Sequence, residues 1–140
     1  LHGMAGVPDL PLNDKVFLIQ SEMIRKVADK GPCVIVGRCA DYVLREKENC
    51  LNVYIYSDLD DRVARATTYY SLSPERAREQ MQKMDKKRAS YYNFYTNLKW
   101  GRAENYDLSL NSAKVGIDGC VDVIRAFAER MEAVAAEKKA

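Results

Sequence analysis

The sequence is poor in the residue types from which metal sites and disulfide frameworks are built. It contains one histidine, His2, and four cysteines, none of which forms a C-x-x-C pair. The spacing of a structural zinc site is therefore missing, and we expect no metal to be held by protein side chains. Cys33, Cys50 and Cys120 lie beside apolar residues and are typical of reduced core thiols, which favours a cytoplasmic protein over a disulfide-stapled secreted one.

Long hydrophobic runs and a strong net charge are also absent. No apolar stretch approaches the roughly 18 residues needed to span a bilayer, and no signal peptide precedes the body of the chain. We therefore expect a soluble, cytoplasmic protein without a membrane partner. The formal net charge of +2 argues against a polybasic surface for nucleic acid. Any anion site must be local, and we expect a small-molecule partner, with the oligomeric state left open.

The remaining composition is typical of a globular domain. Hydrophobic residues make up 47% of the 140 residues and charged residues 30%, and no internal repeat or low-complexity segment is evident. A chain of this length can bury one core and is too short to expect two independent ones. We therefore take residues 1–140 as a single domain.

The first predicted element is an amphipathic helix. Apolar residues recur on one helical face across residues 13–29, with Asn13 or Asp14 available as the N-cap and Gly31-Pro32 as the stop.

Three short segments then read as strands. Residues 33–36 are wholly apolar and β-branched and end at Gly37, which is typical of a strand buried on both faces of a parallel sheet. Residues 51–56 have the β-branched and aromatic content of a second strand, and residues 106–111 alternate as a third. The β-α-β order favours a parallel sheet with right-handed crossovers.

Helices are predicted between and after these strands. One begins near Leu59, after which residues 67–72 form a turn. Ser73-Pro74-Glu75 supplies an N-cap, a first-turn proline and a first-turn acid, so the next helix runs over residues 73–92. Apolar residues at helical spacing over 117–131 predict a closing helix that packs on the sheet, and the polar end of the chain from Glu137 is expected to fray.

The carboxyl ends of the strands are where a ligand is expected. In open parallel α/β sheets, loops and helix N-termini converge there with unpaired N–H groups. The rule selects Gly37-Arg38, residues 57–65 and residues 111–114. Arg38 is the strongest candidate, because its planar fork can grip a phosphate beside a glycine. The alternative is a solvated arginine or a partner for Asp41.

Two helices carry further candidate groups. Arg62 and Arg65 share one helix face, and Asp85 and Arg88 share a face of the next helix, so two basic clusters could line one cleft. The alternative is an ordinary solvated face, because charge runs usually cover exposed helices.

Aromatic residues gather just beyond these charges. Residues 91–95, with Trp100 nearby, could stack on a base or fill a core seam, and core packing is the favoured interpretation. A third possibility is a basic, stacking surface for nucleic acid that includes Arg88, Lys99 and Arg102.

Three segments resemble motifs of the cytidylate-kinase-like family. Residues 31–41 resemble its strand-plus-arginine segment, and residues 85–92 its D-x-x-R lid-helix motif. Residues 105–112, followed by 114–117, are similar to its last strand and adenine-side loop. Three motifs in the right order are more specific than any one of them.

Over roughly residues 13–131 this resemblance implies a P-loop-kinase-type doubly wound parallel sheet flanked by helices, with a lid-like segment at about 67–88. It implies transfer of the terminal phosphate of ATP, with Mg²⁺, to CMP or a related small acceptor. The residues carried over are Arg38, Asp41 and Asp85 for the acceptor, Arg62, Arg65 and Arg88 for the transferring group, and Asn111, Ala113 and Lys114 for the adenine side of ATP.

The sequence departs from the family pattern in two respects. It contains no G-x-x-x-x-G-K-[ST] loop to cradle the β- and γ-phosphates, and it begins with Leu1. We therefore expect a fold that is incomplete at its N-terminus and a 140-residue chain that is inactive alone. Met81 stands where classical cytidylate kinases tend to place another arginine, so CMP specificity is open. The alternative function is a non-catalytic nucleotide- or phosphate-binding regulatory module.

Overall fold

The computed structural model describes residues 9–140. His2 lies outside the described residues. The chain divides into two compact units, Leu1–Cys50 and Leu51–Ala140. The prediction of one kinase-like domain with a lid-like segment stays a prediction.

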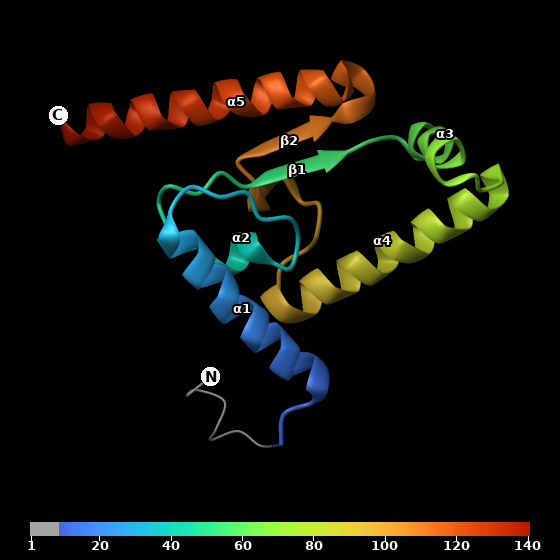
Figure 1. Cartoon of the computed structure of the whole chain (residues 1–140), viewed down its shortest axis with the longest axis horizontal. Coiled ribbons are helices and arrows are strands. Elements are labelled where there is room, and N and C mark those ends of the chain that lie inside the picture. The colour runs from blue at the N-terminus through green and yellow to red at the C-terminus, as the bar shows by residue number, and fades with distance from the viewer. Residues whose placement is uncertain (1–8) are drawn as a thin grey trace. The chain divides into compact units, whose positions relative to one another are not determined.

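The first unit is built around α1 (Leu12–Lys30), which confirms the predicted helix (Figure 1). The N-cap is Pro11 rather than Asn13 or Asp14, and its carbonyl accepts the N–H groups of Asp14 and Lys15 at 3.1 Å. The helix therefore begins slightly earlier than the polar residues suggest, and it ends at Gly31 as predicted. Beyond it, the short α2 (Ala40–Val43) packs against α1.

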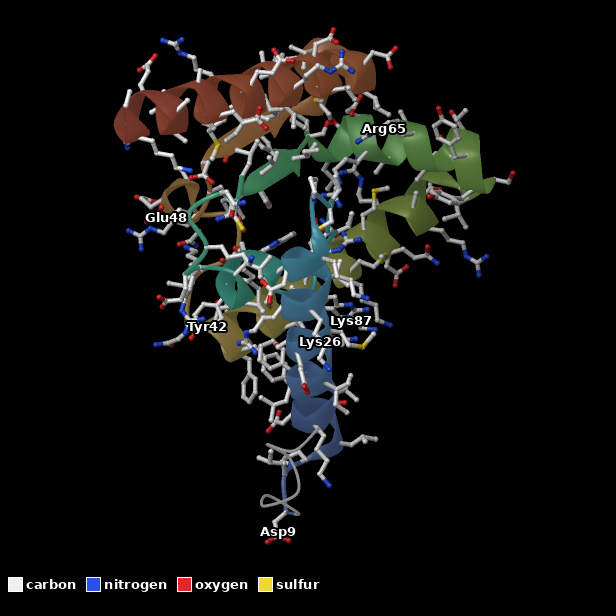
Figure 2. The ribbon with its side chains drawn as sticks, turned by 60° about the vertical axis from the view of Figure 1, so that its left-hand side comes forward. Asp9, Lys26, Tyr42, Glu48, Arg65 and Lys87 are labelled. Atoms are coloured by element: carbon white, nitrogen blue, oxygen red, sulfur yellow. The ribbon has the colours of Figure 1, made fainter. Side chains whose placement is uncertain are left out.

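The loop after α2 is held by local charges. Lys47 Nζ lies 2.8 Å from the carboxylate of Asp29 near the end of α1, and this contact raises the pKa of Lys47. Arg45 places its guanidinium carbon 4.0 Å from the ring centroid of Tyr42, which Figure 2 labels. These contacts are partly or fully exposed, so we expect them to orient the loop more than to stabilise it.

The prediction of a buried strand at residues 33–36 is wrong. The segment is irregular, and Val34 and Val36 are 91% and 88% exposed. A strand is held by backbone hydrogen bonds to a neighbour, and the described residues of the first unit contain no strand that could provide them. Cys33 is exposed for the same reason and is not a core thiol, whereas Cys39 is buried.

The second unit contains a two-stranded parallel sheet. β1 (Val53–Tyr56) and β2 (Leu108–Asn111) lie side by side in Figure 1. Their register runs from Val53 opposite Leu108 to Tyr56 opposite Asn111. The two strands and their parallel pairing confirm the sequence prediction, although each strand is shorter. The described residues are thus mixed α/β and mostly helical, and they do not show the doubly wound sheet that was expected.

A helical hairpin of α3 (Leu59–Tyr70) and α4 (Pro74–Thr96) follows β1. The predicted turn at 67–72 is wrong, because α3 continues to Tyr70 and ends at Ser71 in the left-handed region. Helix α4 begins as predicted, with the Ser73 hydroxyl accepting the N–H of Arg76 at 3.3 Å. It runs one turn beyond Tyr92 and ends at Asn97, which is also left-handed.

The hairpin has an apolar core of its own. Val63, Ala66 and Ala77 are buried in it, and three partly buried residues pack against them: Leu59, Leu72 and Met81. Apolar contacts therefore hold the lid-like segment at 67–88 to the hairpin core, although its sequence is rich in charged residues. Met81, at the position where an arginine was expected, is one of the packing residues.

The chain then passes through the 3₁₀ turn η2 (Ala103–Asn105) into β2 and α5 (Ser112–Lys139). Helix α5 is interrupted at Gly116, whose φ and ψ of 72° and 175° are not helical. The helix continues to Lys139, and the expected fraying from Glu137 stays a prediction. Its last turn carries Lys138 and Lys139, whose charges favour a helix C-terminus.

Candidate functional site

The carboxyl ends of β1 and β2 lie side by side. Tyr56 and Asn111 are register partners, and the hydroxyl of Ser112 donates to the carbonyl of Tyr56 at 3.3 Å. Helices α3 and α5 therefore start from the same edge of the sheet. Residues 57–65 and 111–114 both follow the carboxyl ends of paired strands, and their sharing of one ligand site stays a prediction.

Arg62 and Asp85 form the central contact of the second unit. Arg62 Nη1 donates to Asp85 Oδ2 at 2.6 Å and Nη2 donates to Oδ1 at 3.0 Å, so the pair is bidentate across the α3–α4 hairpin. Their side chains are 23% and 30% exposed. Arg88 Nη1 reaches the same carboxylate at 3.3 Å from one turn along α4. Three of the predicted site residues are thus brought together.

This arrangement sets the protonation of its members. The hydrogen bonds from Arg62 hold the pKa of Asp85 below its usual range, against the opposing effect of partial burial, and the Arg88 charge adds to the lowering. The same hydrogen bonds raise the pKa of Arg62. Asp85 is therefore a carboxylate at neutral pH, and its contacts show it orienting two arginines.

Arg65 lies one turn after Arg62 on α3, where Figure 2 labels it. Its Nε is 3.4 Å from Asp61 Oδ2, but this ion pair lacks hydrogen-bond geometry and the Nε proton has no acceptor among the described residues. Asp61 Oδ2 instead accepts the hydroxyl of Ser57 at 2.6 Å. A buried N–H without an acceptor is costly, so a phosphate oxygen reaching Arg65 would be favourable.

Tyr54 on β1 is a neighbour of the cluster that sequence reasoning missed. Burial raises the pKa of Tyr54, and the charge of Asp85 raises it further while Arg62 and Arg88 oppose the shift. The hydroxyl is therefore within electrostatic reach of all three side chains. The signal in the sequence is the alternation of Tyr54 and Tyr56, which puts both rings on one face of the strand.

Arg38 and Asp41 belong to the first unit, where the backbone is unusual. Gly37, Arg38 and Cys39 have φ values of 71°, 56° and 57°, so two residues with side chains follow a glycine in the left-handed region. Each such residue costs roughly 1–2 kcal/mol, and strain of this kind gathers at functional sites. Asp41 lies in the first turn of α2. That Arg38 and Asp41 share a site with Arg62 stays a prediction.

Buried Cys39 adds to this turn without offering a nucleophile. Burial raises the pKa of its thiol to about 11, Asp41 contributes to the rise and Arg38 opposes it. The thiol is protonated at neutral pH.

The predicted adenine-side residues form a single turn between β2 and the kink in α5. Asn111 Oδ1 accepts the N–H of Ala113 at 3.0 Å, so this side chain caps the turn rather than pointing freely at a ligand. Ala113 and Lys114 are exposed. Gly116 then redirects the chain, in a conformation open to glycine almost alone.

Two further properties concern the described residues as a whole. Within residues 9–140 no group of three or more His, Cys, Asp or Glu side chains could hold a metal ion. None of the helices in this part of the chain has the length and apolar character that a bilayer crossing requires.

Comparison with known proteins agrees with the motifs. The profile of the cytidylate kinase-like family matches residues 1–114. The chain belongs to the cytidylate kinase-like family. This membership confirms the resemblance seen in the sequence and indicates a kinase-like function.

A solved structure supports the fold of this family member. The crystal structure of an uncharacterized protein from Eubacterium ventriosum ATCC 27560 is similar, with 34% sequence identity and a TM-score of 0.81. The similarity covers 87% of this chain and 69% of that one. A search of curated proteins found no match.

Proposed function

We propose that the protein is a nucleoside monophosphate kinase that transfers the γ-phosphoryl group of ATP to CMP or a related small acceptor. The observation that carries this proposal is the grouping of Arg62, Asp85 and Arg88, with Arg65 one turn away, near the carboxyl edge of a parallel sheet. The family membership supports the reaction class.

The chemistry asked of these arginines is electrostatic. Phosphoryl transfer spreads charge over the equatorial oxygens of the moving group, and guanidinium forks match those oxygens. Arg62 is held by the two hydrogen bonds that it donates to Asp85, so it need not reorganise as the charge shifts. Arg65 and Arg88 are 41% and 52% exposed and can approach a phosphate from either side.

ATP and Mg²⁺ fit this donor set as substrate and accompanying ion. The side chains gathered here are mainly guanidinium groups, which suit phosphate oxygens rather than a metal. Mg²⁺ bound to the ATP phosphates would neutralise part of their charge. In this proposal Asn111, Ala113 and Lys114 border the adenine. Arg38 holds the acceptor phosphate, and Asp41 and Asp85 belong to the acceptor side of the site.

A second candidate function is a regulatory module that binds a nucleotide or phosphate without turnover. The observation that favours it is the lack of a G-x-x-x-x-G-K-[ST] loop in the printed sequence. Such a module would keep the arginine cluster and lose the cradle for the β- and γ-phosphates.

Kinetics on the protein expressed from its complete reading frame test the proposal. Phosphoryl transfer from ATP with Mg²⁺ is measured against the common nucleoside monophosphates, for the parent protein and for Arg88→Ala. We expect kcat/KM to fall at least ~10-fold, because a charge-assisted contact contributes about 1.5–3 kcal/mol. Lys87→Ala is the matched control, since this exposed neighbour takes no part in the cluster, and its kcat/KM should not change.

Three outcomes separate the possibilities. Transfer that depends on Arg88 and not on Lys87 supports the kinase. Nucleotide binding without transfer to any acceptor supports the regulatory module. Equal activity of the parent and Arg88→Ala proteins would remove the cluster from the site.

A further inference from the structure

The loop between α4 and β2 is irregular in shape and firmly held. Three backbone N–H groups of the loop donate to side-chain oxygens. The N–H of Leu98 donates to Thr96 Oγ1 at 3.1 Å, that of Trp100 to Asn93 Oδ1 at 2.9 Å, and that of Gly101 to the Tyr106 hydroxyl at 3.2 Å. In addition, the side-chain amide of Asn105 donates from Nδ2 to the backbone carbonyl of Lys99 at 2.7 Å. A loop fixed by dedicated side chains presents its own side chains in one arrangement, as a preorganised site requires.

This loop surrounds an open hollow of about 470 Å³, which is lined by Lys99, Trp100, Gly101 and Arg102. The volume is within the range of small-molecule sites, roughly 300–1,000 Å³. Three of the residues that line it carry an indole ring, an ammonium group and a guanidinium group.

The indole of Trp100 is positioned by an aromatic stack. Its ring meets Tyr54 edge-on, with centroids 5.6 Å apart and planes at 89°, and Tyr54 stacks on Tyr106 at 4.9 Å and 25°. Trp100 is only partly buried by these contacts. The stack therefore fixes the indole and leaves part of its surface open to a ligand.

At Gly101 the backbone passes close to the Tyr54 ring of this stack. A Cβ atom placed there would lie 3.0 Å from the Tyr54 hydroxyl oxygen and 3.3 Å from Cζ, and φ is +80°. Both the space and the backbone conformation require glycine. The approach holds the hollow beside Tyr54.

An aromatic face between two cations selects a planar ring that carries negative charge. Bases stack on indole, and phosphate oxygens pair with Lys99 and Arg102. The ion pair of Arg102 with Glu104, 3.2 Å long, is exposed at both ends, so a phosphate can displace it at little cost. We propose that this hollow binds a nucleotide, with the base on Trp100 and the phosphate between Lys99 and Arg102.

The site adjoins the arginine cluster through Tyr54. One side of this residue contacts Trp100, and its hydroxyl is within electrostatic reach of Arg62 and Asp85. The inference goes beyond the proposed function, because it adds a nucleotide site made of other residues than those proposed for ATP and the acceptor, and it rests on that function only in the choice of nucleotides as probes. A single mononucleotide fits the hollow's volume and its two cations, which favours a free nucleotide over a nucleic-acid strand.

Trp100 is the only tryptophan of the chain, so its fluorescence reports on the hollow directly. The full chain is titrated with AMP, CMP, GMP and UMP, with ribose 5-phosphate and with a short oligothymidylate. We expect saturable quenching by at least one mononucleotide and much weaker quenching by ribose 5-phosphate, which lacks a base. Lys99→Ala and Arg102→Ala should each weaken the binding ~3- to 10-fold. Arg76→Ala, at the other end of α4, is the matched control and should bind as the parent protein does.

A second measurement distinguishes binding in the hollow from a change in Trp100 fluorescence that a ligand bound at another site would cause. Calorimetric titration of Trp100→Phe, which keeps a ring but loses the indole, should show binding at least 3-fold weaker with unchanged circular dichroism. No saturable quenching by any nucleotide, or equal binding by the Lys99→Ala, Arg102→Ala and parent proteins, overturns the inference. So does affinity for the oligothymidylate that exceeds mononucleotide affinity 100-fold, because the surface would then serve a nucleic-acid strand. Phosphoryl transfer without quenching would sink only this inference, and quenching without transfer only the proposed function.

Discussion

Replacing Asp85 by asparagine isolates the charge that holds Arg62. The change keeps the size of the side chain and one oxygen acceptor, but it removes the carboxylate that receives hydrogen bonds of 2.6 Å and 3.0 Å from one guanidinium. Exposed ion pairs contribute about 0.2–1 kcal/mol, and hydrogen bonds to charged groups about 1.5–3 kcal/mol. Because the two side chains are 23% and 30% exposed, we expect a loss of stability between these two ranges, about 1.5 kcal/mol at pH 7.

The loss should depend on pH in a defined direction. Hydrogen bonds from Arg62 depress the pKa of Asp85 in the folded protein, so this residue stabilises the fold fully above its unfolded pKa of about 3.9. The stabilisation disappears as the pH falls through the lower, folded pKa. The difference in unfolding free energy between the parent and Asp85→Asn proteins should therefore be constant near neutral pH and shrink below about pH 4.

Urea unfolding followed by circular dichroism measures the loss of stability at pH 7 and its decrease in acid. Asp60→Asn provides the matched control. Asp60 also pairs with an arginine across the α3–α4 hairpin, Arg78, but its side chain is 86% exposed. We expect Asp60→Asn to lose no more than about 0.5 kcal/mol. Equal losses from the two substitutions, or a loss from Asp85→Asn that does not diminish in acid, would refute the argument from partial burial.

The remaining predictions concern the backbone and the missing loop. Gly116→Ala should lower the unfolding free energy by about 1–3 kcal/mol in urea titrations through backbone strain alone, since nothing lies within 4 Å of the added Cβ atom; unchanged stability would show that α5 tolerates a regular helix there. Arg38→Gly should be more stable than Arg38→Ala by about 0.5–1 kcal/mol in the same assay, because only the glycine relieves the left-handed φ of 56°; the reverse order would mean that the turn is not strained. The 140-residue chain should transfer no measurable phosphate from ATP to CMP with Mg²⁺ in a coupled assay, because its sequence lacks the phosphate-cradling loop; robust turnover would contradict this.

Elements set by neighbouring residues could be predicted from the sequence. Ser73-Pro74-Glu75 fixes the start of α4 through a cap that needs only adjacent residues, and this start is confirmed. The β-branched and aromatic content of residues 51–56 and the alternation over residues 106–111 likewise predicted the two strands, which are observed at Val53–Tyr56 and Leu108–Asn111. The turn at 67–72 was predicted from the start of the next helix at Ser73. That prediction was wrong because α3 continues to Tyr70, with Val63 and Ala66 packed in the hairpin core.

Features that depend on distant partners could not be predicted. Residues 33–36 have the composition of a strand, but a strand also needs a neighbour, and sequence composition does not reveal whether one is present. The sequence placed Arg62 and Asp85 on two helices and allowed one cleft, but the bidentate contact depends on how α3 and α4 cross. The left-handed conformations of Arg38 and Cys39 gave no sequence signal, since neither is a residue that favours positive φ.

The exposed segment at residues 33–36 also affects how the chain behaves in solution. Its valines are almost wholly accessible, and it lies outside any sheet of the first unit. A short β-branched run without charge is a template for pairing between molecules, and such runs drive aggregation when they are left uncovered. Concentrated solutions of this chain should therefore form intermolecular β-structure through Val34 and Val36, and a lysine at either valine should act as a gatekeeper that keeps the protein dispersed.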